Sequence, residues 1–375
     1  MPKTGFLTRK AAWEVLQAVS AGVFSDVALD RVLRRYSFKK VDVSLVAELA
    51  YGSIRQRYLL DSWIDYLGKV PSSKQPPLLR LLLHLGIYQI VQMERIPASA
   101  AINTSVELAK NTQLSKLAPV VNGLLRSVER EYRAGRGLPL PETFSECLAL
   151  EQSLPIWLVE ELIEWRGVKE AVSLAKSFNK IPSFDLRVNR LLTSTRTVQK
   201  KLSTVGVQSD LIIDRPQGLQ VQLGLGNLRQ WPGYDEGEWC VQDRSSQWVA
   251  PLLEVQPGDN VLDACAAPGS KTTHLAELVG NQCEIWAVDR SSQRLKRVLE
   301  NSSRHQISCI KTLVADSTKL LEIKPEWKGY FQKVLLDVPC SGIGTLSRKP
   351  DLRWRLTPQK IDELVELQAR LLKGV

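Results

Sequence analysis

The sequence has little of what builds disulfide scaffolds, metal centres or membrane spans. Its six cysteines are scattered without a CxxC pair, so neither a disulfide framework nor a zinc finger is indicated. Its three histidines show no metal-ligand spacing, and we expect no bound metal. The longest apolar run, residues 78–91, is interrupted by Arg80, His84 and Gln89. It is too short and too polar for a bilayer, which takes about 20 apolar residues.

The N-terminal stretch MPKTGFLTRKAAWEVL has no continuous apolar core and no small-residue cleavage site, so no secretory signal is predicted. We therefore expect a cytoplasmic protein in a reducing compartment. Hydrophobic residues make up 44% of the 375, which excludes wholesale disorder. Lys and Arg number 50 against 40 Asp and Glu, a net charge of +10 that favours a polyanionic partner. The length predicts two to three domains at about 150 residues each.

Residues 6–135 carry apolar side chains at helical spacing and no strand-like alternation. Helices are predicted over residues 98–110 and 119–130, each opened by a proline. The stretch LLRLLLHLGIYQI is apolar nearly all round, so we expect it to be the central buried helix, with His84 as a core or capping residue. The sequence thus predicts an all-α bundle over residues 1–135.

Beyond the Gly- and Pro-rich stretch RAGRGLPLPET, the pattern changes. A helix is predicted over residues 154–178, and short strands and a helix follow at FDLRVN, residues 195–205, LIIDR and LQVQL. We interpret residues 140–240 as a small α+β connector module. From residue 241 strands and helices alternate, which is typical of a parallel sheet. Residues 241–375 are therefore predicted to form a Rossmann-like domain.

The segment ACAAPGSKTTH follows a predicted strand at residues 260–263 and leads into a helix. Its small residues let the backbone approach a ligand closely, and the helix start beyond Pro268 offers unpaired amide groups. The spacing matches neither GxGxxG nor a P-loop, so an ordinary dinucleotide fingerprint and a nucleoside-triphosphate loop are both absent. Taken alone, the loop is equally consistent with an ordinary strand–turn–helix.

Strands are predicted at residues 260–263, 284–288, 310–314 and 333–336. Each of the four ends at or next to an acidic residue: Asp263, Asp289, Asp316 and Asp337. In a doubly wound sheet, an acid at the carboxyl end of the second strand is placed to bind a ribose diol. A single such Asp is usually a cap or turn residue. Four of them, together with the small-residue loop, indicate a cofactor that contains a nucleoside.

The segments DACAAPGSKTTH, AVDRS, VADS and DVPCSGIGTLSRKPDLRW resemble the RsmB/Sun/Fmu family of rRNA cytosine-5 methyltransferases. In the bundle, IPASAAINTSVELAK and APVVNGLLRSVER are similar to the NusB-like RNA-binding domain of that family, and LRVNRLL supports the connector. The resemblance implies a NusB-like bundle, a connector, and a Rossmann-like methyltransferase domain that depends on S-adenosyl-L-methionine.

The resemblance also implies roles for individual residues. Asp289 would hold the ribose hydroxyls, Asp316 would face the adenine edge, and Asp337 would lie beside the methyl-transfer site. Asp263 would order the loop. Ser270 stands where the family often has a second glycine. The loop that would wrap the methionine part of the cofactor consists of Cys265, Ala266, Ala267, Pro268, Gly269, Ser270 and Lys271.

The implied reaction is methylation of carbon 5 of a cytosine in 16S rRNA through a cysteine–cytosine adduct. The RNA enzymes of the family use two cysteines, of which Cys340 would assist product release. The main nucleophile belongs to a later Thr-Cys motif, which we expect beyond Val375, since no Thr-Cys occurs in these residues. The last strands of the sheet are expected there too, so the methyltransferase domain is expected to be incomplete. An RNA-binding protein with an inactive methyltransferase domain, and a DNA enzyme using Cys340 as nucleophile, remain alternatives.

The expected partner is 16S rRNA or a small-subunit assembly intermediate, bound by a monomer. The target base would have to be unstacked or flipped out of a helix. Arg348 and Lys349 match basic positions of the family that meet the substrate strand. Trp231, Trp239 and Trp354 can stack on bases, although packing is the simpler role for each. Further phosphate contacts are expected among the basic residues of the helical domain: Arg31, Arg34, Arg35, Lys39, Lys40, Arg55 and Arg57.

Overall fold

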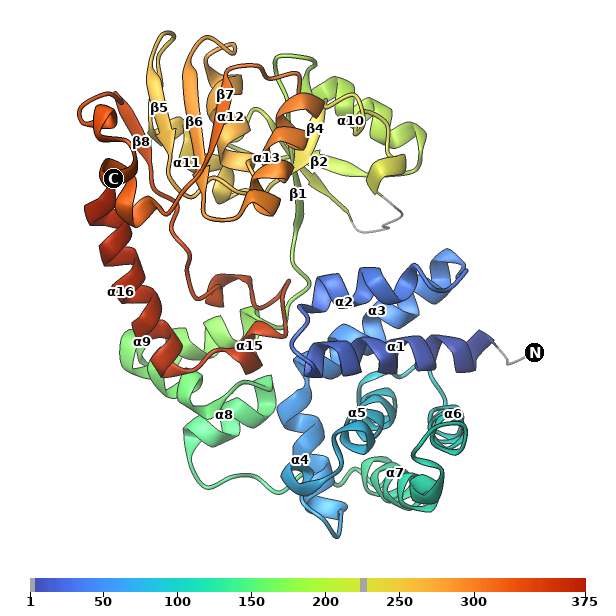
Figure 1. Cartoon of the computed structure of the whole chain (residues 1–375). Helices are drawn as coiled ribbons and strands as arrows, with labels where there is room; N and C mark the ends of the chain where they lie inside the picture. Colours follow the sequence, from blue (N-terminus) through green and yellow to red (C-terminus); the bar gives the residue numbers. More distant parts are fainter. Residues whose placement is uncertain (1–3, 223–227) are drawn as a thin grey trace. The chain divides into compact units, whose positions relative to one another are not determined.

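The computed structural model describes residues 4–222 and 228–375, which divide into two compact units (Figure 1). The first contains the chain up to Ile181 together with Gly342–Pro358, and the second contains Pro182–Ser341 and Gln359–Val375. The division into parts at 1–135, 140–240 and 241–375 stays a prediction, because these units divide the chain elsewhere. None of the helices in the described ranges is long and apolar enough to cross a membrane.

The first unit is helical, as the periodicity predicts. Its core is built around α5, whose side chains from Leu82 to Val91 are all buried. His84 lies in this core, where its Nε2 is 2.7 Å from Asp61 Oδ1. The helices of the bundle are α1 (Thr4–Ser20), α2 (Ser25–Leu33), α3 (Lys40–Arg55), α4 (Arg57–Leu67), α5 (Pro77–Gln92), α6 (Ala98–Lys110) and α7 (Ala118–Arg133).

Two further helices, α8 (Phe144–Gln152) and α9 (Ile156–Ser177), complete the unit together with the short α15 (Leu352–Arg355). Helix α8 has a capping box between Thr143 and Glu146, a start signal that the sequence reading missed. The single helix predicted over residues 154–178 is wrong in one respect. At Gly167 the backbone turns to a φ of 73° and a ψ of 164°, which interrupts the helix.

The second unit begins with a four-stranded antiparallel sheet in the order β2-β3-β1-β4. The strand predicted at LIIDR is wrong beyond Leu211, because Arg215 donates a turn hydrogen bond to the carbonyl of Ile212 and Asp214 has a φ of 64°. The end of LQVQL, Leu223, lies outside the described residues. The elements of this module are β1 (Phe184–Val188), α10 (Thr195–Thr204), β2 (Ser209–Leu211), β3 (Gly218–Val221) and β4 (Trp239–Val241).

The second sheet of this unit is parallel, in the order β7-β6-β5-β8. Figure 1 shows β5, β6 and β7 side by side. Alternate side chains face two cores: Val261 and Ile285 pack with α12 on one, whereas Leu262 and Val288 pack with Trp327 on the other. The elements are α11 (Val249–Leu252), β5 (Asn260–Asp263), α12 (Ser270–Leu278), β6 (Glu284–Asp289), α13 (Ser292–Arg304), β7 (Ile310–Val314), α14 (Leu320–Ile323), β8 (Lys333–Leu335) and α16 (Pro358–Gly374).

The predicted fold class is therefore confirmed: an all-α bundle, then a small α+β module, then a parallel sheet with helices. The four strands of the parallel sheet begin where the sequence predicts them. Because all four run in the same direction, their carboxyl ends lie along one edge of the sheet. That edge is where open α/β sheets bind ligands.

Candidate functional site

The loop after β5 is tied to the edge of the sheet by its own backbone. The amide of Ala266 donates to the carbonyl of Val288 at 2.9 Å, and the amide of Gly269 donates to the carbonyl of Ala266 at 2.7 Å. Ala266 and Ala267 are buried. The loop is thus a fixed turn lined by small side chains, as the sequence predicts.

Gly269 closes this loop and caps α12. Its φ of 98° is a conformation that residues with a side chain rarely adopt. A Cβ at this position would also lie 3.1 Å from the Cα of Val298 on α13. The close approach requires glycine. Helix α12 begins at the next residue, and the first amide groups of a helix have no acceptor within it.

Asp289 ends β6 with its carboxylate almost buried, at 6% exposure. Its Oδ1 accepts from the amide of Ser291 at 2.9 Å, and its Oδ2 lies 3.0 Å from Arg294 Nη1. Arg294 also donates to the carbonyl of Ala267 at 2.8 Å. Asp289 and the loop after β5 are therefore held together by one guanidinium.

Asp263 lies beneath the loop and is fully buried. Its Oδ2 accepts from Thr272 Oγ1 at 2.7 Å, whereas its Oδ1 has no hydrogen-bond partner in the described part of the chain. Burial raises the pKa of Asp263 to about 6, although the bonds from Thr272 and the Cys265 amide oppose the rise. Burial, together with the neighbouring carboxylates, raises the pKa of the Cys265 thiol to about 11. Cys265 is thus a neutral thiol near pH 7.

Asp316, which follows β7, is exposed. Its Oδ1 accepts from the amide and the hydroxyl of Thr318, and these bonds lower the pKa of the carboxyl group. The next residue, Ser317, donates to the carbonyl of Ala264 at 2.5 Å. The turn after β7 is therefore bonded to the start of the loop after β5.

Asp337 follows β8 and forms an ion pair with Lys271 of α12. The pair joins the small-residue loop to the loop that carries Cys340. Cys340 itself is exposed. The carbonyl of Pro339 accepts from Gln368 of α16 at 2.9 Å, which anchors the Pro-Cys loop from its other side.

Arg187 is a residue whose importance the sequence reading missed. It is fully buried in β1, and its guanidinium donates to Glu277 at 2.7 and 3.1 Å, to the carbonyl of Ser270 at 2.5 Å and to Thr273 at 3.0 Å. These three partners belong to α12, and the guanidinium also donates to Gln242 at 2.6 Å. The sequence feature that indicates this role is the arginine within the apolar strand FDLRV, because an arginine inside a buried strand needs an anionic partner.

The structure therefore brings together, at one edge of one sheet, Asp289, Asp316, Asp337 and the loop from Cys265 to Lys271. It does not bring Arg348 and Lys349 into this unit: both are exposed in Gly342–Pro358, which belongs to the helical unit. Trp231 and Trp239 are buried in the antiparallel module, so packing is their role.

Known protein families match two long segments of the chain. Residues 250–375 match the family model for 16S rRNA methyltransferase RsmB/F. Residues 7–130 match the NusB family. The parallel sheet with its loops thus lies in the methyltransferase match, and most of the helical bundle lies in the NusB match.

Whole-chain comparisons agree with these segments. The chain is 42% identical over 368 residues to a Synechocystis protein named "Probable ribosomal RNA small subunit methyltransferase B". The aligned region covers 98% of this chain and 82% of the Synechocystis protein. Among solved structures, PH0851 covers 100% of this chain and 82% of its own, with a TM-score of 0.84 and 27% identity. A methyltransferase homolog protein from Pyrococcus horikoshii matches 62% of this chain and 72% of its own, with a TM-score of 0.53 and 27% identity.

Proposed function

The chain belongs to the ribosomal RNA small subunit methyltransferase B family, and we propose that it transfers a methyl group from S-adenosyl-L-methionine to carbon 5 of a cytosine in 16S rRNA. The observation that carries the proposal is the ion pair between Lys271 and Asp337. It holds the small-residue loop next to the loop with Cys340, so one edge of the sheet offers both a cofactor cradle and a thiol. A substrate of this kind implies action in the cytoplasm.

The residues at this edge fit the proposed cofactor. The positive φ of Gly269 and its close approach to Val298 keep side chains out of the loop. The nearly buried carboxylate of Asp289 is a hydrogen-bond acceptor of the kind that binds a ribose diol. We assign the methionine part to Cys265–Lys271, the ribose to Asp289 and the adenine edge to Asp316. When bound, S-adenosylmethionine supplies the methyl group.

The chemistry of cytosine explains why a thiol belongs at this edge. Carbon 5 is a poor nucleophile, and addition of a thiolate to carbon 6 makes it reactive. After carbon 5 has gained the methyl group, a base removes its proton, the C5–C6 double bond re-forms, and the bond from carbon 6 to sulfur breaks. We assign assistance of that last release to the exposed thiol of Cys340, and the attack to the cysteine of the Thr-Cys motif that the family resemblance implies.

The test uses the full chain, 16S rRNA and methyl-tritiated S-adenosylmethionine, followed by bisulfite sequencing to locate 5-methylcytosine. Asp289→Ala should weaken cofactor binding about 10- to 100-fold in calorimetry, since a hydrogen bond to a charged acceptor contributes ~1.5–3 kcal/mol. The matched control is Glu284→Gln, because Glu284 lies at the opposite end of the same strand and pairs with Lys311. We expect the control to bind normally.

Three outcomes would contradict the proposal. Cofactor affinity that is unchanged in Asp289→Ala would remove the assignment of the ribose site. RNA and cofactor binding without methyl transfer would leave an RNA-binding protein with an inactive methyltransferase domain. Methylation of DNA in preference to RNA, in competition at fixed salt, would favour direct attack by Cys340.

A further inference from the structure

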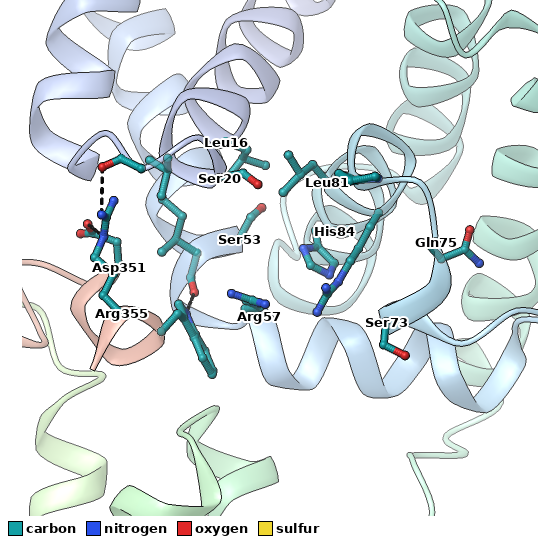
Figure 2. Close-up of a pocket in the computed structure, with 16 residues that line it drawn as sticks. Leu16, Ser20, Ser53, Arg57, Ser73, Gln75, Leu81, His84, Asp351 and Arg355 are labelled. Carbon is teal, nitrogen blue, oxygen red and sulfur yellow. Dashed lines mark hydrogen bonds and ion pairs between the residues drawn. The ribbon is translucent and has the colours of Figure 1, made fainter. Parts of the chain in front are cut away.

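A pocket of about 460 Å³ lies inside the helical unit, and all the residues that line it belong to that unit. Its walls come from α1, α3, the start of α4, α5 and the short α15. Figure 2 shows Ser53, Arg57 and His84 around the same space, with Asp351 and Arg355 at one side. The volume falls in the range of pockets that hold small organic ligands, about 300–1,000 Å³.

Positive side chains outnumber negative ones among the residues that line the pocket. Three guanidinium groups line it, those of Arg57, Arg80 and Arg355, against the one carboxylate of Asp351. The carboxylates of Asp61 and Asp65 act on Arg80 from outside the lining. Asp351 accepts from Arg355 Nε at 2.8 Å and from Ser25 Oγ at 2.5 Å. Both of its oxygens are therefore engaged by the protein.

Asp61 is engaged in the same way on the other side. Its Oδ1 accepts from Arg80 Nε at 2.7 Å, and its carboxylate also bonds to His84. Burial lowers the pKa of His84, so the imidazole adds no charge near pH 7. Arg57 Nε is 3.7 Å from Asp61 Oδ2, beyond hydrogen-bond length. Burial and the charge of Arg80 lower the pKa of Arg57, an environment that favours an added anion.

An unsatisfied hydroxyl on the wall of the pocket also indicates a ligand. Ser53 is 1% exposed, and its Oγ has no hydrogen-bond partner within the described residues. A buried polar group without a partner costs about 1–3 kcal/mol. Since Ser53 lines the pocket, a bound ligand can supply the missing partner.

An aromatic surface stands beside these groups. The indole of Trp354 lines the pocket, and its Nε1 donates to the carbonyl of Ile54 at 2.6 Å, which fixes the ring. The guanidinium of Arg57 lies 5.5 Å from the ring centroid. A fixed ring next to a cation matches the two parts of a nucleotide, a base that stacks and a phosphate that carries negative charge.

We propose that this pocket binds one unpaired nucleotide of an RNA strand, with its phosphate at Arg57 and Ser53 and its base against Trp354. This proposal rests on the rRNA substrate proposed above. It adds a second RNA-binding site to the one at the edge of the parallel sheet.

The test measures binding of the full chain to a fluorescent single-stranded oligoribonucleotide by anisotropy, over a series of salt concentrations. Arg57→Gln should weaken binding about tenfold, since a charge-assisted bond contributes at least ~1.5 kcal/mol. It should also reduce the slope of log K against log salt by about 0.7, the value for one phosphate contact on a single strand. The matched control is Arg133→Gln on α7, whose side chain is 79% exposed outside the pocket.

Ser53→Ala provides a second variant that does not depend on charge. The Oγ of Ser53 has no partner among the residues that the structure describes, so its removal should not lower the melting temperature, while RNA affinity should fall severalfold. Cytidine 5′-monophosphate should compete with the oligonucleotide at concentrations where inorganic phosphate does not.

The outcomes separate this inference from the proposed function. The proposed nucleotide site would be wrong if the wild type binds RNA normally but Arg57→Gln and Arg133→Gln have the same affinity and the same salt slope. The proposal that rRNA is the substrate would not be affected by that result. If inorganic phosphate competes as well as cytidine 5′-monophosphate does, the pocket binds only an anion, and the proposed nucleotide site would also be wrong. Failure of the wild type to bind RNA would overturn both proposals.

Discussion

Two buried carboxylates, Asp263 and Asp61, have pKa values that are shifted in opposite directions. Asp263 has one bonded and one unpartnered oxygen, and burial raises its pKa to about 6. For Asp61 burial acts in the same direction, but the bonds from His84 and Arg80 outweigh it and lower the pKa to about 2. The difference follows from the number of donors each carboxylate receives.

The raised pKa of Asp263 predicts the sign of a pH dependence. Between its ordinary value of 3.8 and about 6, the folded state holds this proton and the unfolded state does not. The stability due to the protonated form is therefore complete below pH 4 and is lost as pH rises through about 6. Relative to Asp263→Asn, the wild type should lose about 3 kcal/mol of unfolding free energy between pH 4 and 7.

Urea denaturation of both proteins across this pH range measures the difference. The variant is the right reference because the buried histidines titrate equally in both chains and cancel. Parallel profiles for the two proteins would show that the Asp263 carboxyl does not have a raised pKa.

At the scale of elements, α12 is the helix on which the candidate site depends. Gly269 caps its start, Lys271 joins it to the loop after β8, and Arg187 of β1 bonds to Ser270 at its first turn and to Glu277 further along. Arg187 is thus a positioning residue: it acts through α12 and the carbonyl of Ser270, which it holds in place.

Arg187→Met should destabilise the protein by about 3–5 kcal/mol, because it leaves the carboxylate of Glu277 buried without its partner. In Arg187→Met/Glu277→Leu the stability should largely return, since an apolar pair replaces the buried ion pair. The affinity for S-adenosylmethionine should stay about tenfold lower in the double variant, because the carbonyl of Ser270 has still lost its donor.

Thermal melts and calorimetry on the same samples separate the two effects. A double variant with both wild-type stability and wild-type cofactor affinity would show that Arg187 serves only the packing of the unit.

At the scale of the whole chain, the helical unit is discontinuous. Gly342–Pro358 leaves the methyltransferase sequence directly after the Pro-Cys loop and completes the fold of the helical unit. Arg353 is its buried anchor: fully buried, it donates at 3.1–3.2 Å to the carbonyls of Arg55, Ser153 and Phe178. These carbonyls come from three different parts of the helical unit.

Arg353→Met should therefore lower the unfolding free energy of the full chain by about 3 kcal/mol, because several buried carbonyls lose their donor together. Arg348→Met is the matched control, since Arg348 is exposed on the same segment. Denaturant midpoints of the two variants measure the difference. Equal midpoints would mean that the segment contributes little to the stability of the helical unit.

The sequence by itself determined the local features of this protein. The strand starts at Asn260, Glu284, Ile310 and Lys333 and the buried face of α5 follow from hydrophobic periodicity, which any short window reveals. The small-residue loop after β5 follows from turn chemistry in the same way. Because parallel strands share one direction, the order of these strands along the chain was enough to bring their acids to one edge.

Only the tertiary structure decided which distant groups meet. The pairing of Lys271 with Asp337, the burial of Arg187 against α12 and the docking of Arg353 on three carbonyls each join residues far apart in sequence. The pocket at Ser53 and Arg57 likewise exists only when α15 packs on the bundle. The physical reason is that periodicity and turn residues act over a few positions, whereas the partner of a buried charge is selected by packing of the whole chain.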